Sequence, residues 1–300
     1  MSLHPIHLRL AAGETLLIDG GMGTEIEKRG VQMIDNAWNA GGVLTAPDTV
    51  RQVHEDYIQA GAQLIITNTF STSRPVLQQV GMLDQFEFLN MRAVELALEA
   101  RANQNAPHVA IAGSMTTIRF KGNPLPSPAY AKESFELQAQ LYADAGVDLI
   151  MLEMMFDIEY TLIALRAAKQ TGLPVWVGMS AWRQEDGTLN IRKDGSIADF
   201  VDAVQDEGAD ALLLMHTLTE NVDACLDVIL PRWDGPAGVY AHSGYFEPPN
   251  WQFIDVISPI DYADHAMRWL ERGVQVIGGC CGIGPEHIVE IRGRILATGI

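Results

Sequence analysis

The sequence predicts an α/β protein of the (β/α)8, or TIM barrel, class, in which eight parallel strands close into a cylinder inside a ring of helices. The chain has 300 residues, of which 48% are hydrophobic and 19% charged, and this suits one large globular domain. Short apolar runs recur eight times, and segments with helical spacing lie between them. Such alternation requires a parallel sheet, and eight repeats favour a closed barrel over an open doubly wound sheet. We therefore expect residues 1–300 to form a single domain.

The apolar runs are rich in aliphatic residues on both faces, as expected of strands buried between a barrel interior and an outer layer of helices. Turn residues or helical segments separate each run from the next. The eight predicted strands are Thr15–Gly21, Ala62–Phe70, His108–Met115, Asp148–Met155, Pro174–Ala181, Ala209–Thr217, Ala237–Gly244 and Val274–Gly282.

The segments between the strands predict helices with one apolar side. In Thr49–Ala60 this side carries Val50, Val53 and Tyr57, and Ser134–Ala145 has the same spacing. Several of these segments end in a glycine directly before the next strand, as helices often do. These glycines are Gly61, Gly146, Gly172, Gly208 and Gly273. Longer polar segments rich in Gly and Pro predict βα loops over the barrel mouth, at Gln32–Ala46, Ile118–Pro128 and Gln184–Asp194.

The charge balance excludes some classes of partner. With 20 Lys and Arg against 38 Asp and Glu, the formal net charge is −18. We expect neither nucleic acid nor an anionic membrane as a partner, because both need clustered cations. No apolar run approaches the ~20 residues of a membrane-spanning helix, and no signal peptide is apparent. The expected location is therefore the cytoplasm, and three cysteines are too few for a disulfide framework.

Polar side chains interrupt the apolar runs near the carboxyl-terminal ends of seven of the eight predicted strands. In barrels of this type the active site lies at that end. The sequence therefore predicts a site there. The interrupting residues are Asp19-Gly20-Gly21, Thr67-Asn68-Thr69, Glu153, Ser180, His216, His242-Ser243 and Cys280-Cys281.

The adjacent cysteines Cys280 and Cys281 are the most specific signal. Neighbouring side chains of a regular strand point to opposite faces, so two thiolates reach one ion only where the backbone turns. The flanking glycines permit such a turn. Thiolates favour a soft or borderline ion, and zinc is the first candidate. Burial as two small hydrophobic residues and a strained vicinal disulfide remain alternatives. Cys225, in the predicted helix Glu220–Leu230, is expected to pack in the core.

Together these motifs resemble the homocysteine S-methyltransferase family over nearly the whole chain. The resemblance implies a (β/α)8 fold and a zinc ion held by three cysteines, two of them the adjacent pair. At the third position, which ends the sixth strand, this chain has His216, so the implied zinc ligands are His216, Cys280 and Cys281. The residues that carry the resemblance are Leu17–Glu25 (LIDGGMGTE), Ile66–Phe70 (ITNTF), Glu153, Gly278–Gly282 (GGCCG) and Pro285–Ile288 (PEHI).

Two further segments depart from the family pattern, and both lie near the expected site. Ala241-His242-Ser243-Gly244 stands where the family has Pro-Asn-Ser-Gly. Met115-Thr116-Thr117 replaces the Gly-Pro pair that follows the third strand in the family. These departures put the substrate and the activity in question while leaving the expected fold unchanged.

The resemblance also implies a reaction and its small-molecule partners. A zinc-bound thiol, of homocysteine or a related compound, attacks the methyl group of a sulfonium donor, S-methylmethionine or S-adenosylmethionine, and homocysteine becomes methionine. Asp19 and Glu153 hold the ammonium end of the substrate, and Glu153 is also the expected catalytic residue. The other expected substrate contacts are Gly20, Gly21, Asn68 and Ser243.

Several alternatives remain open at this stage. His242 either completes a closed, structural zinc site or lies outside the coordination sphere. Trp38, Phe156 and Trp182 either face the cationic donor or pack in the core. The competing functions are a metal-dependent hydrolase or lyase with Glu153 as general base, a family member with another acceptor, and a binding protein without turnover. We expect no folate or cobalamin module, and the sequence predicts no oligomeric state.

Overall fold

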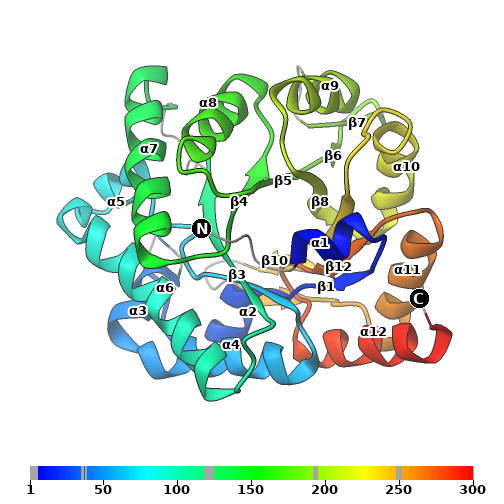
Figure 1. Cartoon of the computed structure of the whole chain (residues 1–300), viewed down its shortest axis with the longest axis horizontal. Coiled ribbons are helices and arrows are strands. Elements are labelled where there is room, and N and C mark those ends of the chain that lie inside the picture. Colours follow the sequence, from blue (N-terminus) through cyan, green and yellow to red (C-terminus); the bar gives the residue numbers. More distant parts are fainter. Residues whose placement is uncertain are drawn as a thin grey trace.

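The computed structural model describes residues 6–34, 37, 39–117, 125–191, 195–247 and 252–299. In this part of the chain eight parallel strands pair in the order β1-β12-β9-β8-β5-β4-β3-β2, and a bridge between Ile18 and Leu64 joins the last strand to the first. The predicted closed barrel is therefore confirmed (Figure 1). Each predicted strand coincides with one barrel strand, although β3 and β8 extend one residue beyond the predicted ends. The barrel strands are β1 (Leu16–Leu17), β2 (Leu64–Ile66), β3 (Ala110–Thr116), β4 (Leu149–Met155), β5 (Val175–Met179), β8 (Ala211–Leu218), β9 (Ala237–His242) and β12 (Val276–Gly279).

Helices surround the strands and connect them in sequence (Figure 1). The helices α4, α7 and α9 end at the predicted glycines Gly61, Gly146 and Gly208, each in the left-handed conformation. The α-helices are α1 (Ile6–Ala11), α2 (Met22–Lys28), α3 (Gly42–Thr45), α4 (Pro47–Ala60), α5 (Arg74–Gln79), α6 (Phe86–Asn103), α7 (Pro128–Ala145), α8 (Ile158–Lys169), α9 (Ile197–Glu207), α10 (Thr219–Ile229), α11 (Pro259–Glu271) and α12 (Pro285–Thr298).

The predicted βα loops contain short elements of their own. The first includes the 3-10 turn η1 (Asn39–Gly41) and α3. The last includes β7 (Leu189–Asn190), which forms a hairpin with β6 (Trp182–Arg183) directly before the predicted loop. A second hairpin, of β10 (Tyr245–Glu247) and β11 (Gln252–Ile254), follows β9. Trp38 and residues 118–124 and 192–194 lie outside the described residues.

Two apolar clusters hold the barrel together. The larger one lies between the strands and the outer helices and includes Cys225, which is buried as expected. The smaller one fills the barrel interior, and there Ile6 and Leu10 of α1 pack with strand residues such as Trp176. Gln275 donates a hydrogen bond to the Leu10 carbonyl at 3.0 Å, which fixes α1 across the amino-terminal end of the barrel (Figure 1). Among the described residues, α1 therefore closes the amino-terminal end of the interior.

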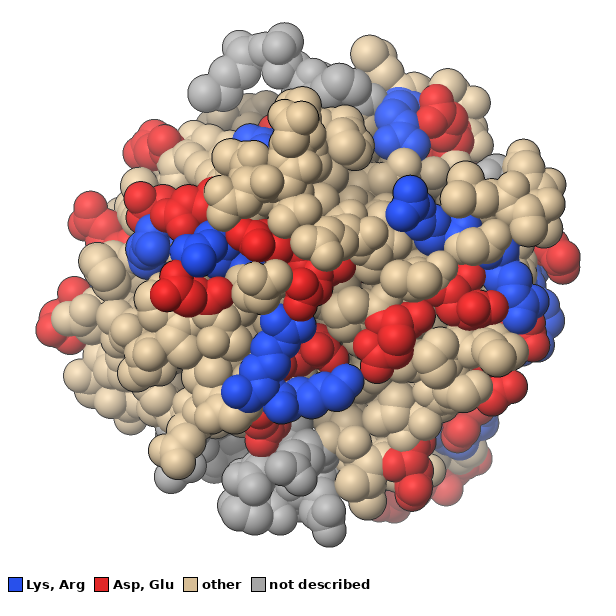
Figure 2. Space-filling view, turned by 90° about the horizontal axis from the view of Figure 1, so that it is seen from below, with Lys and Arg blue, Asp and Glu red and all other residues tan. Residues whose placement is uncertain are grey.

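Charged side chains are interleaved on the surface. Figure 2 shows acidic and basic groups side by side on one face of the molecule. Arginines form ion pairs within this mixture, for example Arg29 with Asp56 at 2.5 Å and Arg92 with Glu99 at 2.7 Å. Among the described residues no helix is long and apolar enough to cross a membrane.

His54 of α4 is a buried polar group without a hydrogen-bond partner among the described residues, on either ring nitrogen. Burial lowers its pKa from 6.5 to about 3. As the pH falls below 6.5, His54 therefore binds a proton in the unfolded chain but stays neutral in the folded chain. The free energy of unfolding decreases progressively down to about pH 3.

We expect His54→Leu to raise the melting temperature, and to raise it more at pH 5 than at pH 7.5. Removing the unpaired nitrogens stabilises the fold by about 1 kcal/mol. Leucine also binds no proton in the unfolded chain, which adds about 2 kcal/mol to the gain in stability at pH 5. Differential scanning calorimetry at the two pH values measures both effects. The exposed His108, changed to Leu, is the matched control and should show no gain. An equal gain at both pH values would contradict the expected linkage.

Candidate active site

A cavity of about 220 Å³ lies at the carboxyl-terminal end of the barrel. Its walls come from the segment after β1 and from the ends of β2, β4, β8, β9 and β12, which is the end of the barrel where the sequence predicts the site. The predicted residues that line it are Gly20, Gly21, Asn68, Glu153, His216, Cys280 and Cys281.

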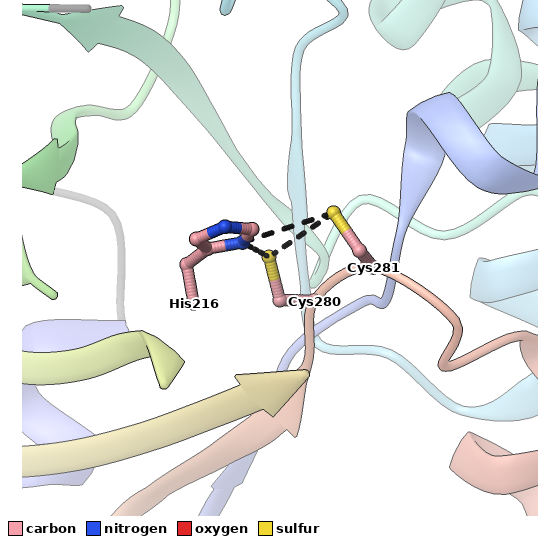
Figure 3. A group of neighbouring side chains, drawn as sticks. All are labelled: His216, Cys280 and Cys281. Carbon is pink, nitrogen blue, oxygen red and sulfur yellow. Dashed lines mark hydrogen bonds between the residues drawn. The ribbon is translucent and has the colours of Figure 1, made fainter. Parts of the chain in front are cut away.

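Three potential metal ligands meet at one side of this cavity (Figure 3). The Nδ1 atom of His216 lies 3.7 Å from Cys280 Sγ and 3.9 Å from Cys281 Sγ, and the two sulfur atoms are 3.9 Å apart. Zinc at about 2.3 Å from sulfur and about 2.0 Å from nitrogen has tetrahedral edges of about 3.8 Å between sulfurs and about 3.5 Å between sulfur and nitrogen. The three atoms are therefore spaced as one face of a zinc tetrahedron. Among the described residues only these three form such a group.

A turn after β12 brings both cysteines to the cavity. The Ile283 amide donates to the Cys280 carbonyl at 3.0 Å, which closes a four-residue turn. Its third residue, Gly282, has φ +81°, a value that type II turns require at this position. A Cβ atom on Gly282 would also lie 2.6 Å from the Ser243 carbonyl oxygen. Two adjacent thiols thus reach one point because the strand has ended.

His216 reaches the cysteines by a local break in β8. Its neighbours Leu213 and Met215 face the barrel interior and Leu214 faces the helices, so regular alternation would turn His216 outward. Instead His216 has φ +43°, and the pairing of β8 with β9 shifts between Met215 and Leu218. The same device appears on β4, where Met154 has φ +54° and lines the cavity directly after Glu153.

His242 does not join the group of potential ligands. Its ring stacks on that of His216, with centroids 4.5 Å apart and an interplanar angle of 30°. Burial is the main cause that lowers the pKa of His242, to about 3, so its ring is neutral at pH 7.

One buried carboxyl group, Glu153, lines the cavity, and a second, Asp19, interacts with it electrostatically but is not among the described lining residues, so its predicted contact with the substrate stays a prediction. Glu153 ends β4 and accepts a hydrogen bond from the Ser114 hydroxyl. Burial raises its pKa to about 7, against the lowering effect of that hydrogen bond. Asp19, only 1% exposed, accepts a hydrogen bond from the Ile66 amide at 2.7 Å, and burial raises its pKa well above the usual value. The described lining contains no Lys or Arg, so the site is suited to cations.

The remaining predicted residues lie in different places. The Ser243 hydroxyl accepts a hydrogen bond from the Ile257 amide at 2.9 Å, so its role in substrate binding stays a prediction. Phe156 and Trp182 contact each other edge to face at 5.7 Å, and neither is among the described lining residues. Phe156 packs against the outer apolar cluster, as its alternative interpretation expected.

Sequence reasoning missed an apolar wall of the cavity formed by four methionines, together with the buried Tyr240. Tyr240 precedes His242 by two residues on β9, so strand alternation could have identified it as facing the interior. Met154 could not be found in this way because of its unusual φ. Its amide donates to Met215 Sδ at 2.9 Å, which joins the breaks in β4 and β8. The four methionines are Met22, Met33, Met154 and Met215.

The family model described as homocysteine S-methyltransferase matches residues 16–295. The chain belongs to this family. Curated relatives include the homocysteine S-methyltransferase of Escherichia coli (27% identical, covering 97% of this chain and 98% of the relative) and the selenocysteine methyltransferase of Astragalus bisulcatus (27%, 96% and 94%). The solved structure of the E. coli homocysteine methyltransferase MmuM in its metallated form has a TM-score of 0.81 at 25% identity, covering 97% of this chain and 99% of that one. The protein is thus a methyltransferase that acts on small molecules, which disfavours the predicted alternatives of a hydrolase and a binding protein.

We expect Glu153→Gln to stabilise the metal-free homocysteine S-methyltransferase homologue at pH 8 and to change it little at pH 5. A carboxyl group with a folded pKa of about 7 and an ordinary pKa of 4.5 destabilises the fold as the pH rises between these values. The neutral amide avoids this cost, which is up to about 3 kcal/mol at pH 8. Melting temperatures in the presence of a chelator test this. The exposed Glu87→Gln is the control, and a melting temperature of Glu153→Gln below that of the parent at pH 8 would show that burial does not set this pKa.

Proposed function

We propose that the protein transfers a methyl group from a small sulfonium donor to the thiol of homocysteine, using a zinc ion held by His216, Cys280 and Cys281. The observation that carries this proposal is the spacing of the three donor atoms, 3.7 to 3.9 Å, on one wall of the cavity. Membership of the homocysteine S-methyltransferase family supports the same reaction.

The donor set suits catalytic zinc. Two cysteines and one histidine with an open fourth position are a known catalytic arrangement. When bound, zinc would keep the thiol of homocysteine as a thiolate at neutral pH. Two thiolates and a neutral imidazole leave the site with a formal charge near zero, whereas three thiolates leave it near −1. We therefore expect this site to bind a substrate thiolate more readily than a three-cysteine site, and to make it a weaker nucleophile.

The carboxyl groups supply the charge that both substrates need. The homocysteine ammonium group and the sulfonium group are cations, and the described lining offers Glu153 without a competing Lys or Arg. A cation beside Glu153 lowers its pKa, so binding of the substrate ionises this carboxyl group near pH 7. Asp19 accepts a hydrogen bond from the amide of Ile66, which fixes the end of β2. Asn68 and the glycines of the Gly20–Gly23 segment complete the polar part of the wall.

Cavity size and lining favour S-methylmethionine over S-adenosylmethionine as the donor. A volume of about 220 Å³ is below the ~300–1,000 Å³ of sites for larger ligands. The methionine wall is apolar and polarizable, so it excludes water from the methyl group during transfer. In the reaction the thiolate sulfur forms a bond to the methyl carbon while the carbon–sulfur bond of the sulfonium breaks. Homocysteine becomes methionine, and the donor leaves as a neutral thioether.

We expect freshly reduced protein to contain about one zinc ion per chain, and Cys281→Ser and His216→Ala to lose most of the metal and the activity together. Metal analysis and methyl transfer to homocysteine, measured on the same samples, test this. Cys225→Ala, which changes a buried thiol outside the cluster, should retain the zinc. Full zinc content in His216→Ala would exclude His216 as a ligand, and absence of zinc from the unchanged protein would refute the proposed metal site.

We expect kcat/KM for S-methylmethionine to exceed that for S-adenosylmethionine by at least about tenfold, because a cavity of about 220 Å³ favours the smaller donor. Mass spectrometry of methionine formed from isotope-labelled donors measures the two rates. Equal rates would contradict the size argument. Breakdown of the donor at the same rate without homocysteine would instead favour a hydrolase.

A further inference from the structure

His242 contacts the proposed metal ligand His216 rather than the metal position. It lies on β9, the strand between β8 and β12, and its ring covers one face of the His216 ring at a centroid distance of 4.5 Å. Phe253 of β11 contacts the His242 ring edge to face, with centroids 6.3 Å apart and an angle of 73°. The His216 ring therefore stacks on a ring that has an aromatic neighbour of its own.

The stacked arrangement prevents His242 from binding the same ion as His216. The lone pair of an imidazole nitrogen lies in the plane of its ring. With an interplanar angle of 30° and centroids 4.5 Å apart, an ion in the plane of the His216 ring lies well away from the plane of His242. The grouping of ligand atoms agrees, because His242 is absent from it. A fourth coordination position then remains free for a substrate sulfur.

The ring of His216 needs such support because its orientation decides which nitrogen faces the sulfurs. Both ring nitrogens are able to bind a metal ion, and in this structure Nδ1 is the one near Cys280 and Cys281. The backbone of His216 has φ +43°, at a break in the strand pairing, so the strand alone does not fix the ring. The Nδ1 atom of His242 is buried without a hydrogen-bond partner among the described residues. This atom therefore adds nothing to the stacking contact between the two rings.

From these contacts we infer that His242 is a positioning residue: its ring holds His216 with Nδ1 toward the two cysteines and leaves the fourth position of the metal open. The inference rests on the proposed metal site. The inference means that the metal site requires the flat surface of a ring at position 242 and does not require a nitrogen that binds the metal. Phenylalanine should therefore replace His242, whereas alanine should not.

The test compares His242→Phe with His242→Ala in the full-length protein. Zinc affinity is measured by competition with a chromogenic chelator, and the geometry of the site is measured from the absorption bands of the Co²⁺-loaded protein. We expect His242→Ala to weaken zinc binding by about 2- to 12-fold, the effect of losing one aromatic pair, and to shift the Co²⁺ bands. His242→Phe should restore both the affinity and the spectrum.

The control is His265→Ala, which removes another histidine ring that lies against an aromatic side chain, Trp269, at 5.7 Å. This variant should keep the zinc affinity and the Co²⁺ spectrum. Equal weakening in His242→Phe and His242→Ala would mean that a nitrogen of His242, as a ligand or as the hydrogen-bond partner of the His216 backbone, supports the site in place of the ring surface. No weakening in either would mean that the stack has no role. Both results overturn the inference while the unchanged protein still binds zinc, whereas failure of the metal site itself appears as absence of zinc binding in the unchanged protein.

Discussion

The site depends on the parallel pairing of β8, β9 and β12 across one side of the barrel. Their register pairs Met215 with Tyr240 and Gly279 with Ala241. His216, His242 and Cys280 lie one or two residues beyond these pairs, so they come at neighbouring levels at the carboxyl-terminal end of the sheet. A slip of one residue in either pairing would move the side chains of an entire strand to the opposite face and separate the His216 nitrogen from the cysteine sulfurs. Barrel closure excludes such a slip because every strand is paired on both sides.

Register alone places side chains at the mouth but does not aim them. His216 and Met154 each follow an inward-facing residue, and both turn to the cavity only because their backbones take φ values of +43° and +54°. Such conformations cost about 1–3 kcal/mol each in residues other than glycine, and they persist where surrounding contacts hold them. The contact between the Met154 amide and Met215 Sδ and the stacking of His242 on His216 are contacts of this kind. The strained positions therefore carry the functional groups, and the regular strands stabilise them.

This division explains how far the sequence could predict the protein. Apolar runs and helix-ending glycines specify the barrel because they reflect burial and local backbone preference, and position near a strand end was enough to identify Glu153 and the cysteine pair. The contact between His216 and His242 could not be read from periodicity, since alternation places His216 on the wrong face. Ser243 illustrates the same limit, because its hydroxyl is engaged by the amide of Ile257, in a segment fourteen residues away. Spacing along the chain predicts which strand end a residue reaches, and tertiary contacts decide which way it points.

The electrostatics of the cavity depend on carboxyl groups that are buried away from water. Surface charges of both signs are interleaved and ion-paired, so a net charge of −18 does not by itself direct a ligand to the barrel mouth. Burial raises the pKa of both Asp19 and Glu153, which means that the surrounding protein opposes a negative charge at these positions. A cation beside Glu153 would relieve that opposition, and an uncharged group would not. The burial of this carboxyl group therefore favours cationic over uncharged ligands in the cavity.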